Sequence, residues 1–275
     1  MKERAKSAFI MLPLLVIVFL GGYFLIAGVI ALTILALREF SAAFGEKKPA
    51  MWVFIVSLIL LYATNVIRAD FTLPLSVWVF VSVALCLISM FATEKRDLIH
   101  GMAGFVGVFY IIFFAFHLVL IDLNSFVHIG LRGFQFSGFN SYVWIVLMSA
   151  FGTDIFAYLF GKAIGKRKLC PSISPNKTVE GSIGGVIGSI LLCGIFSLIF
   201  MRTEFWTCIV IGAAGGVFSQ FGDLAASVMK RKIGIKDWGN LIPGHGGVLD
   251  RIDSVLFTAP LVYYILLLKI YIFVL

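Results

Sequence analysis

Long apolar runs separated by short polar stretches make up most of the chain. An α-helix needs about 20 predominantly apolar residues to cross a bilayer. Each run of about this length therefore predicts one membrane-spanning helix. These runs are 50–67, 72–92, 99–122, 141–163, 181–201, 205–229 and 252–274.

The first apolar block, Ala8–Leu37, is too long for one spanning helix and too short for two full ones. Gly21 and Gly22 interrupt it, and adjacent glycines favour a turn. We expect a short first helix, a turn at these glycines, and a second helix that ends near Phe44. The whole pattern predicts an all-α, polytopic membrane helix bundle of about nine transmembrane helices.

Composition supports a membrane protein and excludes several other classes. Hydrophobic residues make up 61% of the chain and charged residues 13%, which leaves little room for a separate soluble domain. The net charge is +8. Nucleic acid is not expected as the partner, because no basic helix or aromatic platform faces water. Membrane orientation and anionic substrates explain the positive charge better.

The basic residues lie almost entirely in alternate loops. If the N-terminus is inside, eighteen of the 22 Lys and Arg fall on the inner side. The exceptions are Arg68, Arg132, Arg202 and Lys269. Inner loops of membrane proteins are enriched in Lys and Arg. We therefore expect a multi-pass protein of the cell inner (plasma) membrane with a cytoplasmic N-terminus.

Candidate chemistry is concentrated in the second half of the sequence. We divide the chain into N-terminal transmembrane helices, 1–135, and a catalytic transmembrane bundle, 136–275, with cytoplasmic loops 164–180 and 230–251. In the first part, Arg38 and Glu39 are interpreted only as a helix end at the membrane interface.

Asp154 lies inside an apolar run, where a carboxylate is costly and is a functional candidate by default. Tyr158 and Lys162 follow four and eight residues later, so all three share one helix face. The alternative is a buried Asp–Lys pair that only stabilises the bundle.

A polar segment comes next, and Ser174 with Pro175 predicts a helix N-cap followed by the first helical residue. Lys177 beside such a helix start would attract phosphate. The glycines at 181–188 and the small residues at 212–226 allow close helix contact. These two faces could pack within one bundle or across a homodimer.

The helix predicted at 205–229 places small residues and two charged ones on a single face. They are Gly212, Gly216, Ser219, Asp223, Ala226 and Lys230. This face brings Asp223 to the cytoplasmic end of the bundle, where an unpaired carboxylate would be costly. Either a metal ion or Lys230 would satisfy it.

The densest run of charge is Ser227–Asp253. Asp250 and Asp253 are three residues apart at the start of the last helix, so they project to one side. Together with Asp223 they would form an all-oxygen site suited to Mg²⁺. The alternative is that these acids are favoured by the helix dipole, which does not explain Asp223.

The glycines around His245 permit positive φ and close backbone approach. They are compatible with a simple turn, but beside Asp250 and Arg251 we interpret them as a phosphate cradle. A hydrogen bond to phosphate or to a base is expected for His245. A zinc site is not, because no second His or Cys lies at metal spacing.

This region resembles the diagnostic motif of the phosphatidate cytidylyltransferase (CDP-diacylglycerol synthase) family. The pattern S-x-x-K-R-x4-K-D-x-G-x3-P-x-H-G-G-x-x-D-R-x-D is filled by Ser227, Lys230, Arg231, Lys236, Asp237, Gly239, Pro243, His245, Gly246, Gly247, Asp250, Arg251 and Asp253. The segment from Asp154 to Lys166 and the segment Ser174–Gly181 are also similar to that family. The likeness covers about 141–260.

The resemblance implies transfer of the cytidylyl group of CTP to phosphatidic acid, which forms CDP-diacylglycerol and pyrophosphate for phospholipid synthesis. The catalytic residues would be Asp223, Asp250, Asp253 and Lys177. We assign Mg²⁺ to Asp223 and Asp250, with Asp253 behind them or at a second cation. The residues expected at the substrates are Lys230, Arg231, Lys236, Asp237, His245, Gly246, Gly247, Arg251, Ser227, Glu180 and Asp154.

Two other classes stay open at this point. A CDP-alcohol phosphotransferase would need a D-G-x-x-A-R motif, which the segment 222–226 lacks. An ion-coupled transporter could use Asp154 and Asp223 as intramembrane carboxylates, but it would leave the loop before Asp253 unexplained.

Overall fold

The computed structural model describes residues 15–66, 72–91, 98–123, 141–241 and 246–274, and these are mostly helical. The α-helices are α2 (Gly22–Ala42), α3 (Met51–Asn65), α4 (Thr72–Phe91), α5 (Leu98–Val106), α6 (Phe114–Leu123), α7 (Ser141–Ile164), α8 (Val179–Phe200), α9 (Phe205–Ile233) and α10 (Leu249–Val274). The π-helical segment η2 (Gly107–Phe113) joins α5 to α6, and the short 3-10 helices are η1 (Gly45–Lys47) and η4 (Arg202–Glu204). A small antiparallel hairpin consists of β1 (Lys168–Cys170) and β2 (Ser174–Thr178).

The predicted spans agree closely with the observed helices. In the described part of the chain, six helices are long and apolar enough to cross a membrane, and two shorter apolar helices, Met51–Asn65 and Leu75–Phe91, accompany them. The protein is therefore an all-α, polytopic membrane bundle. The predicted first helix is visible over residues 15–20. Residues before 15 lie outside the described part of the chain, so the total of nine helices stays a prediction.

The predicted turn at Gly21 and Gly22 is confirmed, because their φ angles are +62° and +50°. L-residues with side chains rarely adopt such angles, so glycine suits this position. The N–H of Gly22 donates to the carboxylate of Asp122 at 2.8 Å. This bond ties the start of α2 to the end of α6.

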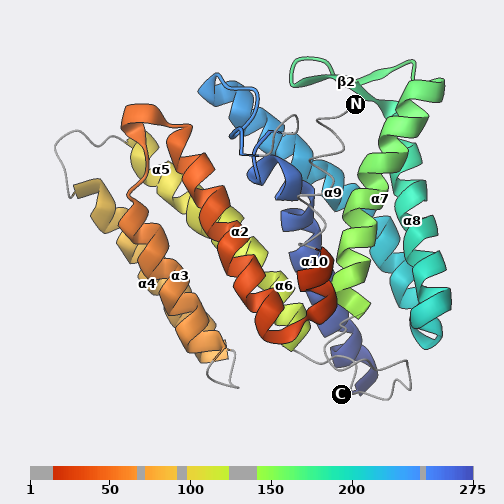
Figure 1. Cartoon of the computed structure of the whole chain (residues 1–275), viewed down its shortest axis with the longest axis horizontal. Helices are drawn as coiled ribbons and strands as arrows, with labels where there is room; N and C mark the ends of the chain where they lie inside the picture. The colour runs from red at the N-terminus through yellow and green to blue at the C-terminus, as the bar shows by residue number, and fades with distance from the viewer. Residues whose placement is uncertain (1–14, 67–71, 92–97, 124–140, 242–245, 275) are drawn as a thin grey trace.

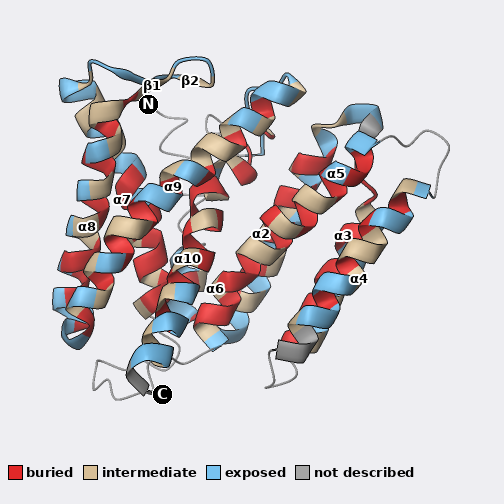
Figure 2. Cartoon of the chain, turned by 180° about the vertical axis from the view of Figure 1, so that it is seen from behind, coloured by how far each residue is buried: buried red, intermediate tan, exposed pale blue. Residues whose placement is uncertain are grey.

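The helices form two groups that meet at α10 (Figure 1). On one side α7, α8, α9 and α10 pack against one another in chain order. On the other side α3 and α4 pack together, and α2 lies along α6. α10 contacts helices of both groups, namely α2, α6, α7 and α9. Buried residues face the spaces between the helices and exposed residues face outward (Figure 2).

The two small-residue faces pack inside the chain. A Cβ atom added at Gly184 or Gly188 would lie 2.4 and 2.1 Å from ring atoms of Phe160 and Phe156 on α7. One added at Gly212 would lie 2.9 Å from the backbone of α8. Of the two uses that the sequence allows, these faces therefore serve packing within one bundle. The homodimer stays a prediction.

The predicted helix start at Ser174 and Pro175 is wrong. These residues belong to strand β2, and α8 begins four residues after Pro175, at Val179. The N-cap is Thr178, whose Oγ1 accepts the N–H of Gly181 at 3.1 Å. Pairing with β1 extends the backbone through Thr178, and this long-range contact overrides the local capping signal.

Candidate active site

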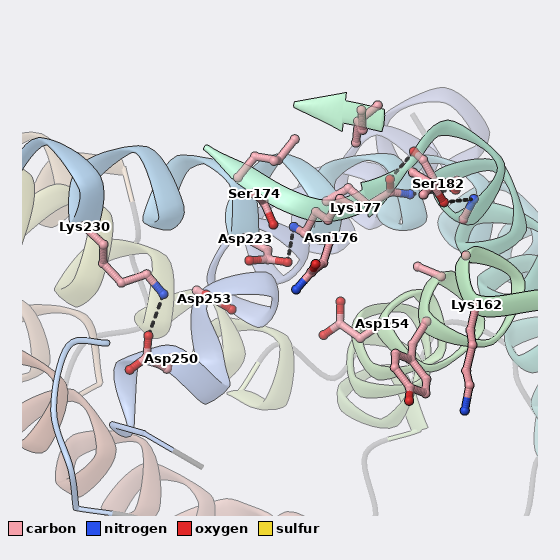
Figure 3. A pocket seen from close by; sticks show the side chains of 18 of the residues that line it. Asp154, Lys162, Ser174, Asn176, Lys177, Ser182, Asp223, Lys230, Asp250 and Asp253 are labelled. Atoms are coloured by element: carbon pink, nitrogen blue, oxygen red, sulfur yellow. Dashed lines mark hydrogen bonds and ion pairs between the residues drawn. The ribbon is translucent and has the colours of Figure 1, made fainter. Parts of the chain in front are cut away.

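A cavity of about 780 Å³ opens at one end of the bundle, between α7, β2, α8, α9 and α10 (Figure 3). The hairpin, the C-terminal end of α9 and the N-terminal end of α10 gather there (Figure 1). Its polar lining is formed by Asp154, Tyr158, Lys162, Ser174, Asn176, Lys177, Thr178, Ser182, Gln220, Asp223, Lys230, Asp237, Asp250, Arg251 and Asp253.

More than half of the site residues predicted from sequence line this single cavity. They are Asp154, Lys177, Asp223, Lys230, Asp237, Asp250, Arg251 and Asp253. They come from four elements and the loop after α9, although up to about 100 positions separate them in sequence. Arg251 lines the cavity although its helical spacing from Asp250 and Asp253 predicts a different direction.

Asp223 of α9 forms an ion pair with Lys177 of β2 across the cavity (Figure 3). Both side chains are partly buried, with 29% and 28% of their surfaces exposed. The hydroxyl of Ser227, one turn further along α9, also donates to Asp223 at 3.5 Å. The expectation that Lys230 could pair with Asp223 is wrong. The hairpin places Lys177 beside Asp223 instead, and Lys230 pairs with Asp250.

Lys230 forms an ion pair with Asp250 at 2.6 Å, and these side chains are only 10% and 4% exposed. The second oxygen of Asp250 accepts the N–H of Trp238 at 2.8 Å and that of Gly247 at 3.0 Å. Asp250 therefore holds the loop between α9 and α10 as well as the lysine. Removing one partner of such a buried pair leaves an uncompensated charge, which costs about 3–5 kcal/mol.

Asp253 and Asp154 complete the acidic lining. Asp253 is buried, and one of its oxygens accepts the N–H of Ser254 at 2.7 Å. The hydroxyl of Ser254 donates to Asp154 at 3.4 Å, which links α10 to α7. Among the described residues Asp154 forms no ion pair with Lys162, so the purely structural Asp–Lys alternative is not observed.

The other predicted residues that the structure describes do not belong to the lining of the cavity. Glu180 accepts the N–H groups of Lys166 and Arg167 at 3.0–3.3 Å and thereby shapes the turn after α7. Arg231 donates to the carbonyl of Ile235 at 3.0 Å. The others of this group are Ser227, Lys236, Gly246 and Gly247, whereas His245 lies outside the described residues.

The phosphate-cradle hypothesis for the glycines stays a prediction, but part of that backbone already has partners. The N–H of Gly247 donates to Asp250, and the next two N–H groups donate to Glu39 of α2. Gly246 adopts φ +84°, which supports the expectation of a positive φ in this turn.

Three residues stand out among those around the site that sequence reasoning missed. Ser182 and Gln220 line the cavity and bond to each other, which joins α8 to α9. A polar Gln within the apolar run of α9 is the signal that could have found this pair. Glu39 was interpreted only as a helix end, and no local signal shows that it reaches a loop more than 200 residues away.

The donor set of the cavity fits Mg²⁺ in chemistry. Its carboxylates are hard oxygen ligands, and Mg²⁺ commonly binds one or two of them together with water and substrate phosphates. The described residues contain no group of three His, Cys, Asp or Glu that could hold an ion by themselves. Asp223 and Asp250 each contact a lysine, so a bound cation would replace these ammonium groups as their counter-charge.

Comparison with known proteins extends over nearly the whole chain. A model of the cytidylyltransferase family matches residues 2–269. The phosphatidate cytidylyltransferase of Synechocystis sp. is 34% identical over 90% of this chain and 90% of its own length. The Bacillus subtilis protein of the same name is 45% identical over 46% of this chain and 48% of its own. The one from Staphylococcus haemolyticus is 39% identical over 56% and 61%. Since the family model covers both halves of the bundle, this chain belongs to the cytidylyltransferase family.

Proposed function

We propose that this protein transfers the cytidylyl group of CTP to phosphatidic acid and forms CDP-diacylglycerol and pyrophosphate. One observation carries the proposal: lysines and aspartates line one cavity at the end of a membrane bundle. The relatives named phosphatidate cytidylyltransferase support the same substrates. Nothing in the comparisons supports another phosphotransferase or a transporter.

The reaction joins two anions, so charge neutralisation and positioning are its main demands. A phosphate oxygen of the lipid attacks the α-phosphorus of CTP, and the bond from that phosphorus to the bridging oxygen of the β-phosphate breaks. The electron pair leaves with pyrophosphate. The lipid phosphate is already anionic at neutral pH, so no general base is required.

The residues of this chain suit these demands. Lys177, Lys230 and Arg251 face one cavity and would hold the triphosphate and the lipid phosphate. Each of these two lysines, Lys177 and Lys230, forms an ion pair with an aspartate of the same cavity. If phosphate oxygens of the substrates bind these lysines in place of the aspartates, the carboxylates of Asp223 and Asp250 become available to a cation.

Asp223 and Asp250 would hold Mg²⁺, and Asp253 would lie behind them or serve a second cation. When bound, Mg²⁺ would neutralise charge on the triphosphate and on the leaving pyrophosphate. The site would lie on the cytoplasmic side of the cell inner membrane, which the positive-inside asymmetry and the bacterial relatives favour.

The lipid would enter sideways from the inner leaflet. Tyr158 lines the cavity and is 67% exposed, and its neighbours Ile155 and Leu159 are exposed on the outside of α7. This part of α7 thus joins the cavity to a surface that an acyl chain can contact.

The test uses purified protein in detergent with phosphatidic acid, Mg²⁺ and radiolabelled CTP. The wild type is expected to place label in the lipid fraction and to release pyrophosphate. Asp250→Asn is expected to lower the initial rate about 100-fold or more, because it weakens the pair with Lys230 and removes a charged oxygen ligand.

Thermal unfolding of each variant provides the control for folding. A wild type that transfers no label in the presence of both substrates and Mg²⁺ would contradict the proposed function. If Asp250→Asn kept full activity, the function would stand and the assignment of Asp250 to the metal would be lost.

A further inference from the structure

The N-terminal end of α10 needs hydrogen-bond acceptors that its own sequence does not supply. The first N–H groups of a helix have no partner inside it. Here those of Val248 and Leu249 are buried, with residue exposures of 6% and 0%. The two residues before them, Gly246 and Gly247, have no side chains that could cap the helix. Buried N–H groups without acceptors are costly, so an acceptor from elsewhere is required.

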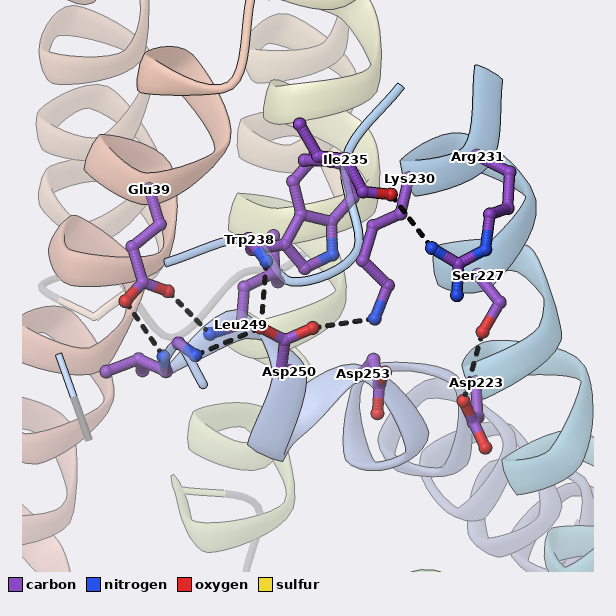
Figure 4. A network of polar contacts seen from close by, with 12 residues as sticks. Glu39, Asp223, Ser227, Lys230, Arg231, Ile235, Trp238, Leu249, Asp250 and Asp253 are labelled. Carbon is purple, nitrogen blue, oxygen red and sulfur yellow. Dashed lines mark hydrogen bonds and ion pairs between the residues drawn. The ribbon is translucent and has the colours of Figure 1, made fainter. Parts of the chain in front are cut away.

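Glu39 of α2, which lies about 210 residues earlier in the sequence, supplies that acceptor. One carboxylate oxygen accepts the N–H of Val248 and the other accepts that of Leu249, both at 3.0 Å (Figure 4). A carboxylate at this end also interacts favourably with the positive end of the helix dipole.

Two glycines leave room for this carboxylate. A Cβ added at Gly239 would lie 2.6 Å from Glu39, and one added at Gly247 would lie 2.5 Å from it. Real Cβ atoms essentially never come so close to other atoms. Gly239 and Gly247 therefore form the walls of a slot that the Glu39 carboxylate fills.

The same loop segment is held from its other side by Asp250. Its carboxylate accepts the N–H groups of Trp238 and Gly247, the immediate neighbours of Gly239 and Val248. The ring of Trp238 also contacts that of Phe40, with centroids 5.3 Å apart. Two carboxylates, Glu39 and Asp250, thus hold one turn of backbone between them (Figure 4).

We propose that Glu39 is a positioning residue for the reaction, which fixes the start of α10 so that Asp250 and Arg251 point into the cavity. The proposal rests on the function proposed above. Glu39 does not line the cavity, so it acts through the loop and the first turn of α10. It also gives α2, in the half without motif residues, an indirect part in the site.

The substitution Glu39→Gln separates this role from simple packing, because it keeps the shape of the side chain. It replaces one acceptor oxygen by an NH₂ group, which would face an N–H donor of α10. We expect the start of α10 to shift, and a displacement of about 1 Å near reacting groups can lower a rate about 100-fold. The initial rate of label transfer is therefore expected to fall about 10-fold to 100-fold.

Trypsin cleavage gives a readout that does not depend on activity. Lys236 is exposed in the loop that Glu39 holds, whereas Lys166 to Lys168 are exposed at the hairpin, away from it. Glu39→Gln is expected to speed cleavage after Lys236 several-fold and to leave cleavage at 166–168 as in the wild type. Glu46→Gln, at an exposed residue of η1, is the matched control and is expected to behave as the wild type.

Gly239→Ala is the second variant, and it crowds the Glu39 carboxylate without removing it. It is expected to reproduce both effects, with the thermal midpoint close to that of the wild type. The proposal is overturned if both variants keep activity within twofold of the wild type. It is also overturned if cleavage rises equally at both segments or does not rise at Lys236. A wild type without transferase activity would contradict the proposed function, while the cleavage comparison would still test how Glu39 holds the loop.

Discussion

The two halves of the bundle use their polar side chains differently. In the described part of the first half, some buried polar groups join neighbouring helices. Ser57 bonds to Ser82 at 2.8 Å, and the indole N–H of Trp78 donates to the carbonyl of Ser57. In the second half, Asp223 and Lys177 face a common cavity. Polar side chains therefore join helices in the first half, whereas in the second half they also line a cavity, the proposed substrate site.

The largest expected effect comes from breaking the Lys177–Asp223 pair on the cavity side. Lys177→Met removes a cation from the proposed triphosphate site and leaves Asp223 without its ionic partner. We expect label transfer to fall about 100-fold or more, whereas Lys177→Arg should retain part of the activity. Lys168→Met, at an exposed residue of β1 outside the cavity lining, is the control. A rate of Lys177→Met above half that of the wild type would contradict the assignment.

A smaller effect, on stability rather than on activity, is expected at the close contact between α7 and α8. Gly188→Ala would place a Cβ 2.1 Å from the ring of Phe156, and such overpacking costs about 1–3 kcal/mol. Gly104→Ala in α5 is the matched change in the first half, since its Cβ would meet only Cys86 Sγ at 3.8 Å. Unfolding of both variants by increasing SDS concentration measures the difference. Equal stabilities would show that α7 and α8 can separate without cost.

The smallest effect is expected for the polar pair of the first half. Ser57→Ala removes the hydrogen bond to Ser82, and bonds of this kind within membranes contribute about 0.6 kcal/mol on average. We expect a small loss of stability in the same SDS titration and an unchanged rate of label transfer. A clear loss of activity would break the comparison, because it would place this pair in the catalytic machinery.

Much of the fold could be predicted from the sequence because bilayer thickness fixes helix length. The predicted spans 141–163 and 205–229 lie within the observed helices Ser141–Ile164 and Phe205–Ile233. Two kinds of local signal predicted residues of the cavity. Asp250 follows from its helical spacing to Asp253 beside the charged loop, and Asp154 follows from its place inside an apolar run; both residues line the cavity.

Partners far apart in sequence could not be predicted. Lys177 reaches Asp223 only because the hairpin folds back over α9, and the same hairpin moves the start of α8 from Ser174 to Thr178. Lys269, which had no assigned role, pairs with the buried Glu204 near the start of α9. None of these contacts has a local signal, because each depends on how separate elements pack.

The bond between Glu39 and the start of α10 has a consequence for the order of biosynthesis. A ribosome makes chains from the N-terminus at about 5–20 residues per second. Glu39 is therefore synthesised roughly 10–40 s before its partners Val248 and Leu249, which follow 209 and 210 residues later. During that interval a membrane-inserted fragment has its early helices but an incomplete site. The enzyme becomes competent only when its last helix enters the bilayer, so prematurely terminated chains would carry no activity.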